Sequence, residues 1–171
     1  MILKKFSVKV ILICVVLTLA MNGCASRQHT DNMSNYLSTD VPLLFDEQRL
    51  FPDVDFLTDE TVKQYLSESV STFMFDDMFF LLRCVYSEAE YSEEVNRIVD
   101  SGAVFCEDVF QFPAYVMLIS RNCYEYALIN EPENEIIYVY AQTAGWEYFE
   151  SFPDIYIPVF PTNYEICQYE T

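Results

Sequence analysis

The sequence predicts an α+β domain, a largely antiparallel sheet with two helices packed on one face. Three strand-like runs separated by turn residues fill the second half of the chain, and two amphipathic helical patterns precede them. Strands and helices alternate only once, which argues against a doubly wound nucleotide-binding fold. The length of 171 residues, with 52% hydrophobic positions, suits a single domain and is too short for two ordinary ones.

The chain opens with a pattern typical of an export signal. Three lysines and no acid lie within the first 23 residues, and the apolar run Val10 to Met21 follows the last of these lysines. As a helix, the twelve residues of this run would span about 18 Å, against the ~30 Å hydrocarbon core of a bilayer. A secretory signal therefore explains the run better than a permanent transmembrane helix.

The residues after the apolar run indicate the kind of signal. The stretch LAMNGCAS resembles the lipobox of bacterial lipoproteins, in which a small residue precedes a cysteine. Gly23 and Cys24 match that pattern, whereas Met21 and Asn22 stand where leucine and alanine or serine are usual. The resemblance implies that residues 1–23 are a lipoprotein signal peptide and that Cys24, lipidated on sulfur, becomes the N-terminus. A plain signal peptide is the alternative.

A diacylglycerol on Cys24 would supply two acyl chains, enough for stable anchoring in a membrane. All 27 acids follow Gly23, but only six of the nine bases do, so the mature chain carries a net charge of −21. Such a surface is drawn neither to anionic lipid nor to nucleic acid, and we expect no nucleic-acid partner. Attachment to the membrane would depend on the lipid itself.

A spacer and an irregular segment are expected next. Residues 24–41 are rich in Ser, Thr, Asn and Asp and lack apolar periodicity, which is typical of a flexible tether. We expect the single folded domain to occupy residues 42–171. Its first part, Val41 to Phe56, mixes large apolar residues with two prolines, which indicates an irregular segment packed on the domain.

The first helix is expected after Thr58, which can serve as its N-cap. Its apolar residues recur at the i, i+3 and i+4 spacing of a helix, at Val62, Tyr65 and Leu66. Acidic residues in the first turn favour a helix N-terminus. This helix should end near Ser69.

A central strand and a second helix follow. Met78 to Tyr86 is apolar on both faces of a pleat, as expected of a strand covered on two sides. Ser87, with Glu90 three residues later, has the spacing of a capping box, and Gly102 stands where a helix C-terminal glycine belongs. Between them runs an apolar stripe: Ala89, Tyr91, Val95, Ile98 and Val99.

Three strands should complete the sheet as an antiparallel meander. They cover Ala114 to Ser120, Cys123 to Ile129 and Glu135 to Ala141, and turn residues separate them. Beyond them, Gly145 to Ser151 suits a short helical turn. Ile155 to Phe160 looks extended, and its proline confines it to a sheet edge or to no sheet.

Four cysteines remain beyond Cys24, an even number in a chain expected to be exported, where disulfides persist. They are Cys84, Cys106, Cys123 and Cys167. None has the CxxC spacing of a redox or zinc motif. Cys84 and Cys123 fall within expected buried strands, where a free thiol behaves as a small hydrophobe. The sequence is compatible both with disulfides and with reduced core thiols.

Several kinds of chemistry lack residues to carry them. His29, the one histidine of the sequence, lies in a polar stretch, so neither a histidine-based triad nor a multi-histidine zinc site can be built. No histidine is available to activate a cysteine nucleophile. Only Gly102 and Gly145 follow the signal, which excludes a glycine-rich phosphate loop. We therefore expect no catalytic residues, no metal and no cofactor.

Two clusters suggest a ligand but have simpler explanations. Four acids resemble the start of a calcium loop: Asp53, Asp55, Asp59 and Glu60. Phe56 and Leu57, however, occupy places where such a loop needs a ligand and a glycine, so a solvated acidic face is favoured. Trp146, Tyr148 and Phe149 have the composition of a sugar-stacking group, but closing one end of an aromatic-rich core explains them better.

The sequence thus favours an exported, lipid-anchored protein of the cell envelope whose domain faces outward. Its domain is expected to be a non-catalytic module that binds a protein or another envelope ligand, or has a structural role. One alternative is an acidic inhibitor or immunity-type protein that acts on a basic envelope enzyme. Another is an envelope hydrolase, because any two of the 27 acids could converge in space.

Overall fold

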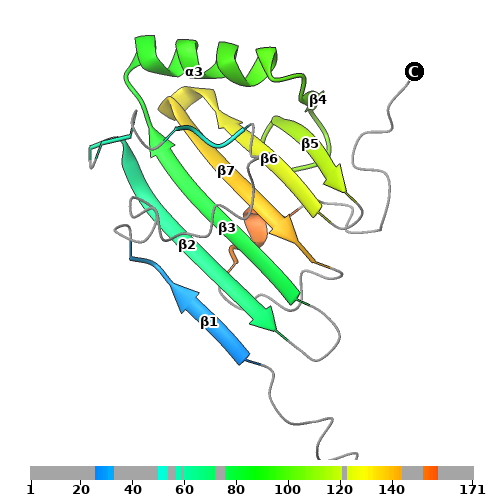
Figure 1. Ribbon diagram of the computed structural model, residues 1–171. Helices are drawn as coiled ribbons and strands as arrows, with labels where there is room; N and C mark the ends of the chain where they lie inside the picture. Colours follow the sequence, from blue (N-terminus) through cyan, green and yellow to red (C-terminus); the bar gives the residue numbers. More distant parts are fainter. Residues whose placement is uncertain are drawn as a thin grey trace, which may run out of the picture.

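The computed structural model describes residues 26–32, 50–53, 57–58, 60–71, 76–120, 123–143 and 152–157. Within these ranges the chain forms one seven-stranded sheet and an α-helix that covers one of its faces (Figure 1). The strands lie in the order β1-β2-β3-β7-β6-β5-β4, and all neighbouring pairs are antiparallel. The expected α+β class with a largely antiparallel sheet is confirmed at this level.

The strands have the following bounds: β1 Ser26–Thr30, β2 Val62–Ser71, β3 Asp76–Val85, β4 Val104–Cys106, β5 Ala114–Ser120, β6 Cys123–Asn130 and β7 Glu135–Gln142. The expected strand around Met78 to Tyr86 corresponds to β3, and the expected meander corresponds to β5, β6 and β7. The meander joins the rest of the sheet through β7, which pairs with β3. β3 and β7 are therefore interior strands, as the sequence predicts.

The helix that covers the sheet is α3, Glu88–Asp100, and its expected capping box is confirmed. The Glu90 amide donates to the Ser87 hydroxyl at 3.4 Å, and the Ser87 amide donates to the Glu90 carboxylate at 3.1 Å. Gly102, just past the helix, has a φ of +83°, a conformation that favours glycine. Tyr91 and Ile98 lie two turns apart and bury the same face of α3 against the sheet.

The expected helix after Thr58 is wrong, because these residues form β2. Thr58 does begin one turn, in which its carbonyl accepts from the amides of Thr61 and Val62 at 3.0 and 3.1 Å. The chain then pairs with β3, and a register shift between Val62 and Gln64 changes the alternation of side chains. This shift gives a strand the three-residue spacing that resembles a helix. The described residues therefore contain one α-helix where two were expected.

Five residues of the segment expected to be a flexible tether form β1. Ser26 pairs with Ser71 and Thr30 with Ser67, so this short strand extends the sheet beyond β2. Its residues are polar and mostly exposed, which explains why no apolar alternation predicts it. The rest of residues 24–41, apart from Asp31 and Asn32, lies outside the described ranges.

The sheet separates two hydrophobic clusters. On the α3 side, residues of alternate strand positions pack with α3 and with Leu50 and Phe51; they include Leu82, Cys84, Ala127, Ile136, Tyr138 and Tyr140. The opposite side buries another set: Phe79, Leu81, Phe110, Tyr126, Ile137, Val139, Phe152 and Tyr156. β7 contributes to both sets, as expected of a strand covered on two faces.

Two shorter features complete the described chain. The turn expected between β6 and β7 is a 3-10 helix, Glu131–Glu133, followed by Asn134 in the left-handed region. The extended run expected from Ile155 begins with another 3-10 turn, Asp154–Tyr156, while 158–160 and the expected turn at 145–151 lie outside the described residues. No helix among the described residues is long and apolar enough to cross a membrane.

Candidate functional site

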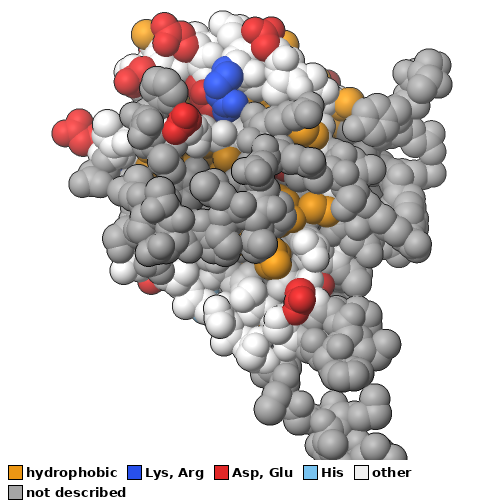
Figure 2. Space-filling model, viewed as in Figure 1, with side chains coloured by type: hydrophobic (Ala, Val, Ile, Leu, Met, Phe, Trp, Pro, Cys, Tyr) orange, Lys and Arg blue, Asp and Glu red, His pale blue; other side chains and the backbone are white. Residues whose placement is uncertain are grey.

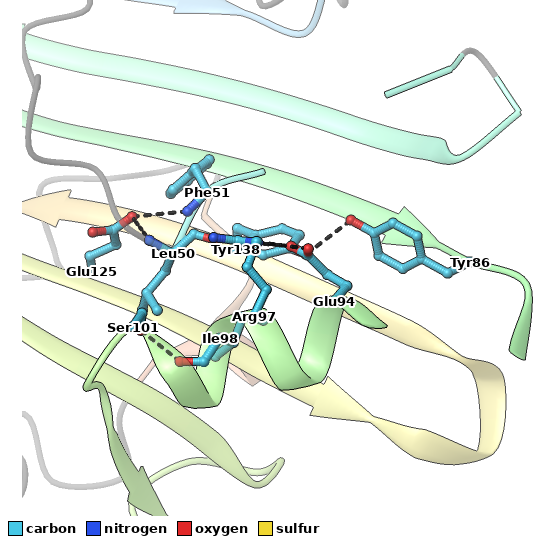
Figure 3. Close-up of polar contacts among 9 residues, drawn as sticks. All are labelled: Leu50, Phe51, Tyr86, Glu94, Arg97, Ile98, Ser101, Glu125 and Tyr138. Carbon is cyan, nitrogen blue, oxygen red and sulfur yellow. Dashed lines mark hydrogen bonds and ion pairs between the residues drawn. The ribbon is translucent and has the colours of Figure 1, made fainter. Parts of the chain in front are cut away.

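A hydrogen-bonded polar cluster lies between α3 and the sheet (Figure 3). The Tyr138 hydroxyl donates to Oε1 of Glu94 at 2.6 Å and lies 2.9 Å from the hydroxyl of Tyr86. Arg97 donates to both carboxylate oxygens of Glu94, from Nε at 2.7 Å and from Nη2 at 2.6 Å. A two-pronged arginine–carboxylate pair of this kind has a fixed geometry.

Three secondary-structure elements position this cluster. Glu94 and Arg97 are three residues apart on α3, so both side chains lie on the same face of the helix. Tyr138 comes from the centre of β7, and Tyr86 follows directly after β3. The Glu94 side chain is only 13% exposed, and its contacts with Arg97 and Tyr138 compensate for the loss of water.

The same cluster fixes Leu50 and Phe51, two residues that lie far from α3 in the sequence. Arg97 Nη2 donates to the carbonyl of Leu50 at 2.6 Å. Oε1 of Glu125, a fully buried residue of β6, accepts from the amides of Leu50 and Phe51 at 2.9 and 3.1 Å. One acidic and one basic side chain therefore satisfy both amides and the Leu50 carbonyl of this buried segment. We call Leu50 and Phe51 the clamped segment.

The chemistry of the cluster follows from its burial. Desolvation is the main cause that raises the pKa of Tyr86 and that of Tyr138, and nearby Glu94 adds to both. Both phenols therefore stay protonated near neutral pH, and their hydroxyls form the hydrogen bonds of this cluster. The pKa of Arg97 is raised mainly by its hydrogen bonds with Glu94. This arrangement holds α3, the sheet and the clamped segment together.

The cysteines divide between the two states that the sequence leaves open. Cys84 and Cys123 are free and buried, and burial raises the pKa of the Cys84 thiol to about 12. Sγ of Cys123 lies 3.0 Å from the hydroxyl of Tyr140. Cys106 is disulfide-bonded, to a cysteine outside the described residues. Cys24 and Cys167 also lie outside those ranges.

The other candidate residues are not brought together into a ligand-binding arrangement in the part of the chain that the structure describes. Asp53 and Glu60 are exposed, whereas Asp55, Asp59 and the aromatic group at 146–149 fall outside the described residues. Among the residues that the structure describes, no group of three or more His, Cys, Asp or Glu side chains could hold a metal ion. His29 lies on β1 and is exposed.

Sequence reasoning missed the buried acids. Glu125 and Glu135 are almost fully buried, and so is Glu68, whose carboxylate lies 3.1 Å from Nε of Arg27. Glu135 forms an ion pair with Arg83 and accepts from Nδ2 of Asn130 at 2.8 Å. The signal for Glu125 was present, because this acid interrupts an otherwise apolar and aromatic strand. Its partners, however, are distant in sequence.

No family model, no curated protein and no solved structure matches the chain at a significant level.

Proposed function

We propose that the protein is a lipid-anchored cell-envelope lipoprotein whose sheet domain binds a partner and is not catalytic. The observation that carries this proposal is the position of β1, which begins at Ser26, two residues after Cys24. Cleavage before Cys24 would keep all seven described strands, because each of them lies at or after Ser26 in the sequence.

The disulfide of Cys106 supports an exported location. Disulfides form and persist in oxidising compartments outside the cytosol and are rare inside it. Cys84 and Cys123 are buried within the sheet, where a reduced thiol can remain as part of the core.

A binding role is supported by how the reactive side chains are used. Tyr138 of the sheet donates to Glu94 of α3, and Arg97 of the same helix holds the clamped segment through the Leu50 carbonyl. The Cys84 thiol, with a pKa of about 12, stays protonated at neutral pH and is therefore a poor nucleophile. These groups serve the fold, which leaves the exposed surface to carry out the function.

The test is to follow where the protein goes in a bacterial host that performs lipoprotein maturation. The full chain should fractionate with the membrane, and Cys24→Ala should release it to the medium or leave an unprocessed precursor. Gln28→Ala, at an exposed position of β1, is the matched control and should behave as the unaltered chain. Membrane association of Cys24→Ala, with normal processing, would refute the proposal.

The acidic inhibitor is a second candidate, favoured by the charge at one end of the sheet. Exposed carboxylates from the first turns of α3 and from the β6–β7 turn define this acidic end: Glu88, Glu93, Glu131 and Glu133. The residues beside these two elements are joined directly, because the Tyr86 amide, just before the N-cap of α3, donates to the carbonyl of Asn134, just after the turn, at 2.9 Å. Figure 2 shows acidic side chains along the top of the view, where α3 lies.

Salt-sensitive inhibition of a cationic murein hydrolase by the mature chain would identify this second function. Replacing Glu131 and Glu133 by Gln should weaken that inhibition, whereas replacing the exposed acids Glu107 and Asp108 by their amides should not. Equal loss in both variants would mean that net charge alone acts, without a specific surface.

A further inference from the structure

The first strand lies very close to the expected lipid. Only Ala25 separates Cys24 from Ser26, so the two Cα positions are at most about 7 Å apart. Ser26 is held in the sheet opposite Ser71, and β1 stays paired with β2 to Thr30. The sheet itself, and not a long tether, therefore follows the anchor.

Strand register shows which end of the sheet this is. Ser26 pairs with Ser71, and Ser71 pairs with Asp76, so β1 starts where β2 ends and β3 begins. Gln142, at the end of β7, is aligned with Met78 of β3 near the same end. In Figure 1 β1 lies at the bottom of the view and α3 at the top. We call the end formed by Ser26, Ser71 and Asp76 the anchor end.

The acidic end lies at the opposite end of the strands. β3 runs from Asp76 to Val85, and its ten residues span about 30 Å. Val85 pairs with Glu135, directly after the turn that carries Glu131 and Glu133. The α3 helix starts three residues beyond Val85, and its first turns bring Glu88 and Glu93 to this end.

Charge along this axis favours one orientation at an anionic bilayer. Negative headgroups repel carboxylates within a Debye length, about 8 Å at physiological salt. Among the described residues of the anchor end, Asp76 is the exposed acid, and its Oδ1 accepts a hydrogen bond from the Ser71 hydroxyl. Arg27 of β1 forms an ion pair with Glu68 at 3.1 Å, so this pair adds no net charge to the sheet near the anchor end. When the anchor end faces the lipid, the carboxylates of the acidic end lie about 30 Å away, which is beyond the range of this repulsion.

We propose that the anchored domain stands on the bilayer through its anchor end and presents its acidic end to the envelope. This orientation rests on the proposed acylation of Cys24. The lipid surface contacts the start of β1 and the adjoining ends of β2 and β3. The α3 helix and the β6–β7 turn then lie about 30 Å from the lipid surface.

The orientation can be tested with fluorescent labels at the two ends of the full-length, matured protein. Ser71→Cys labels the anchor end and Ala89→Cys, in the first turn of α3, labels the acidic end; neither changes a charge. Cys84 and Cys123 are buried, so a thiol reagent applied to the folded protein should spare them. The labelled proteins are inserted into vesicles of phosphatidylethanolamine and phosphatidylglycerol that contain a headgroup spin-labelled lipid as quencher.

We expect the label at position 71 to be quenched several-fold more than the label at position 89. Equal quenching, or stronger quenching at position 89, in a protein that is acylated by mass and floats with the vesicles would overturn the orientation alone. A protein that carries no lipid and does not float would overturn the proposed anchoring and the orientation together. Unlabelled protein, reacted under the same conditions, controls for labelling of the native thiols.

Discussion

At the scale of single residues, the buried acid Glu125 explains why a segment distant in sequence is part of the core. Its carboxylate accepts from two buried amides, those of Leu50 and Phe51. Without Glu125 these two amides would be buried with no hydrogen-bond partner to replace water, which is costly. The acid therefore contributes more to the free energy of unfolding than an ordinary surface hydrogen bond does. Arg97 completes the contact by binding the Leu50 carbonyl.

Replacing Glu125 by Ala should therefore lower the free energy of unfolding by about 2 to 4 kcal/mol. Urea denaturation measures this loss, and Glu107→Ala, at an exposed acid, is the control, expected to change stability by less than about 0.5 kcal/mol. Equal stability of the two variants would show that the clamped segment does not depend on Glu125.

Stability should also fall at alkaline pH, because burial raises the pKa of Cys84 from 9.0 to about 12. Between these values the unfolded chain loses the thiol proton while the folded chain keeps it, so unfolding is favoured as pH rises. This group should contribute a slope of about −1.4 kcal/mol per pH unit, and raised pKa values of Tyr86 and Tyr138 act in the same direction above pH 10.

The measurement is the free energy of unfolding from urea titrations between pH 8 and pH 11. Cys84→Ala, which removes the titrating group, should have a shallower slope than the unaltered chain whatever its stability at neutral pH. Identical slopes would contradict the raised pKa of this thiol.

At the scale of elements, local signals predict α3 well because its determinants lie within a few residues. The Ser87 and Glu90 pair and Gly102 act on adjacent backbone groups. β2 and β1 depend on partners elsewhere: the spacing of Val62 and Tyr65 suits a helix as well as a strand with a register shift, and only pairing with β3 decides. β1 is polar and becomes a strand because β2 offers an edge.

In the candidate site, too, local sequence signals predict some features, whereas contacts between distant residues determine others. The sequence predicts Cys84 and Cys123 in buried strands but leaves their redox state open, and in the structure both are buried, free thiols. The contacts of Glu94 with Tyr138 and of Glu125 with Leu50 join residues 44 and 75 positions apart, and no local pattern encodes them. Such pairings become visible only once the strand order is known.

The interior position of β3 and β7 gives a direct test at this scale. Leu82 and Val139 are fully buried on opposite faces of the sheet, so replacing either by Ala should cost about 1 to 4 kcal/mol through lost burial and a residual cavity. Val99→Ala, at an exposed position of α3, should be nearly neutral. Near-neutral effects at both buried sites, seen in thermal or urea unfolding, would contradict the arrangement of the sheet.

At the scale of the whole molecule, the proposed lipid on Cys24 limits which cysteine can be the disulfide partner of Cys106. Maturation as proposed would remove Cys14 with the signal and block the sulfur of Cys24, while Cys84 and Cys123 are free. Cys167 is then the cysteine left to pair with Cys106. Peptide mapping without reduction should recover that pair, whereas a peptide that joins Cys106 to Cys24 would exclude acylation of the same molecule.

The central claim is that this strongly acidic domain is held at the membrane by a lipid on Cys24, directly before its first strand. Mass spectrometry of the N-terminal tryptic peptide from the membrane-extracted protein tests it most directly. Trypsin cuts after Arg27, so the account predicts the peptide Cys24 to Arg27 with a diacylglyceryl group on sulfur. The same peptide without lipid, or an N-terminus other than Cys24, would contradict it.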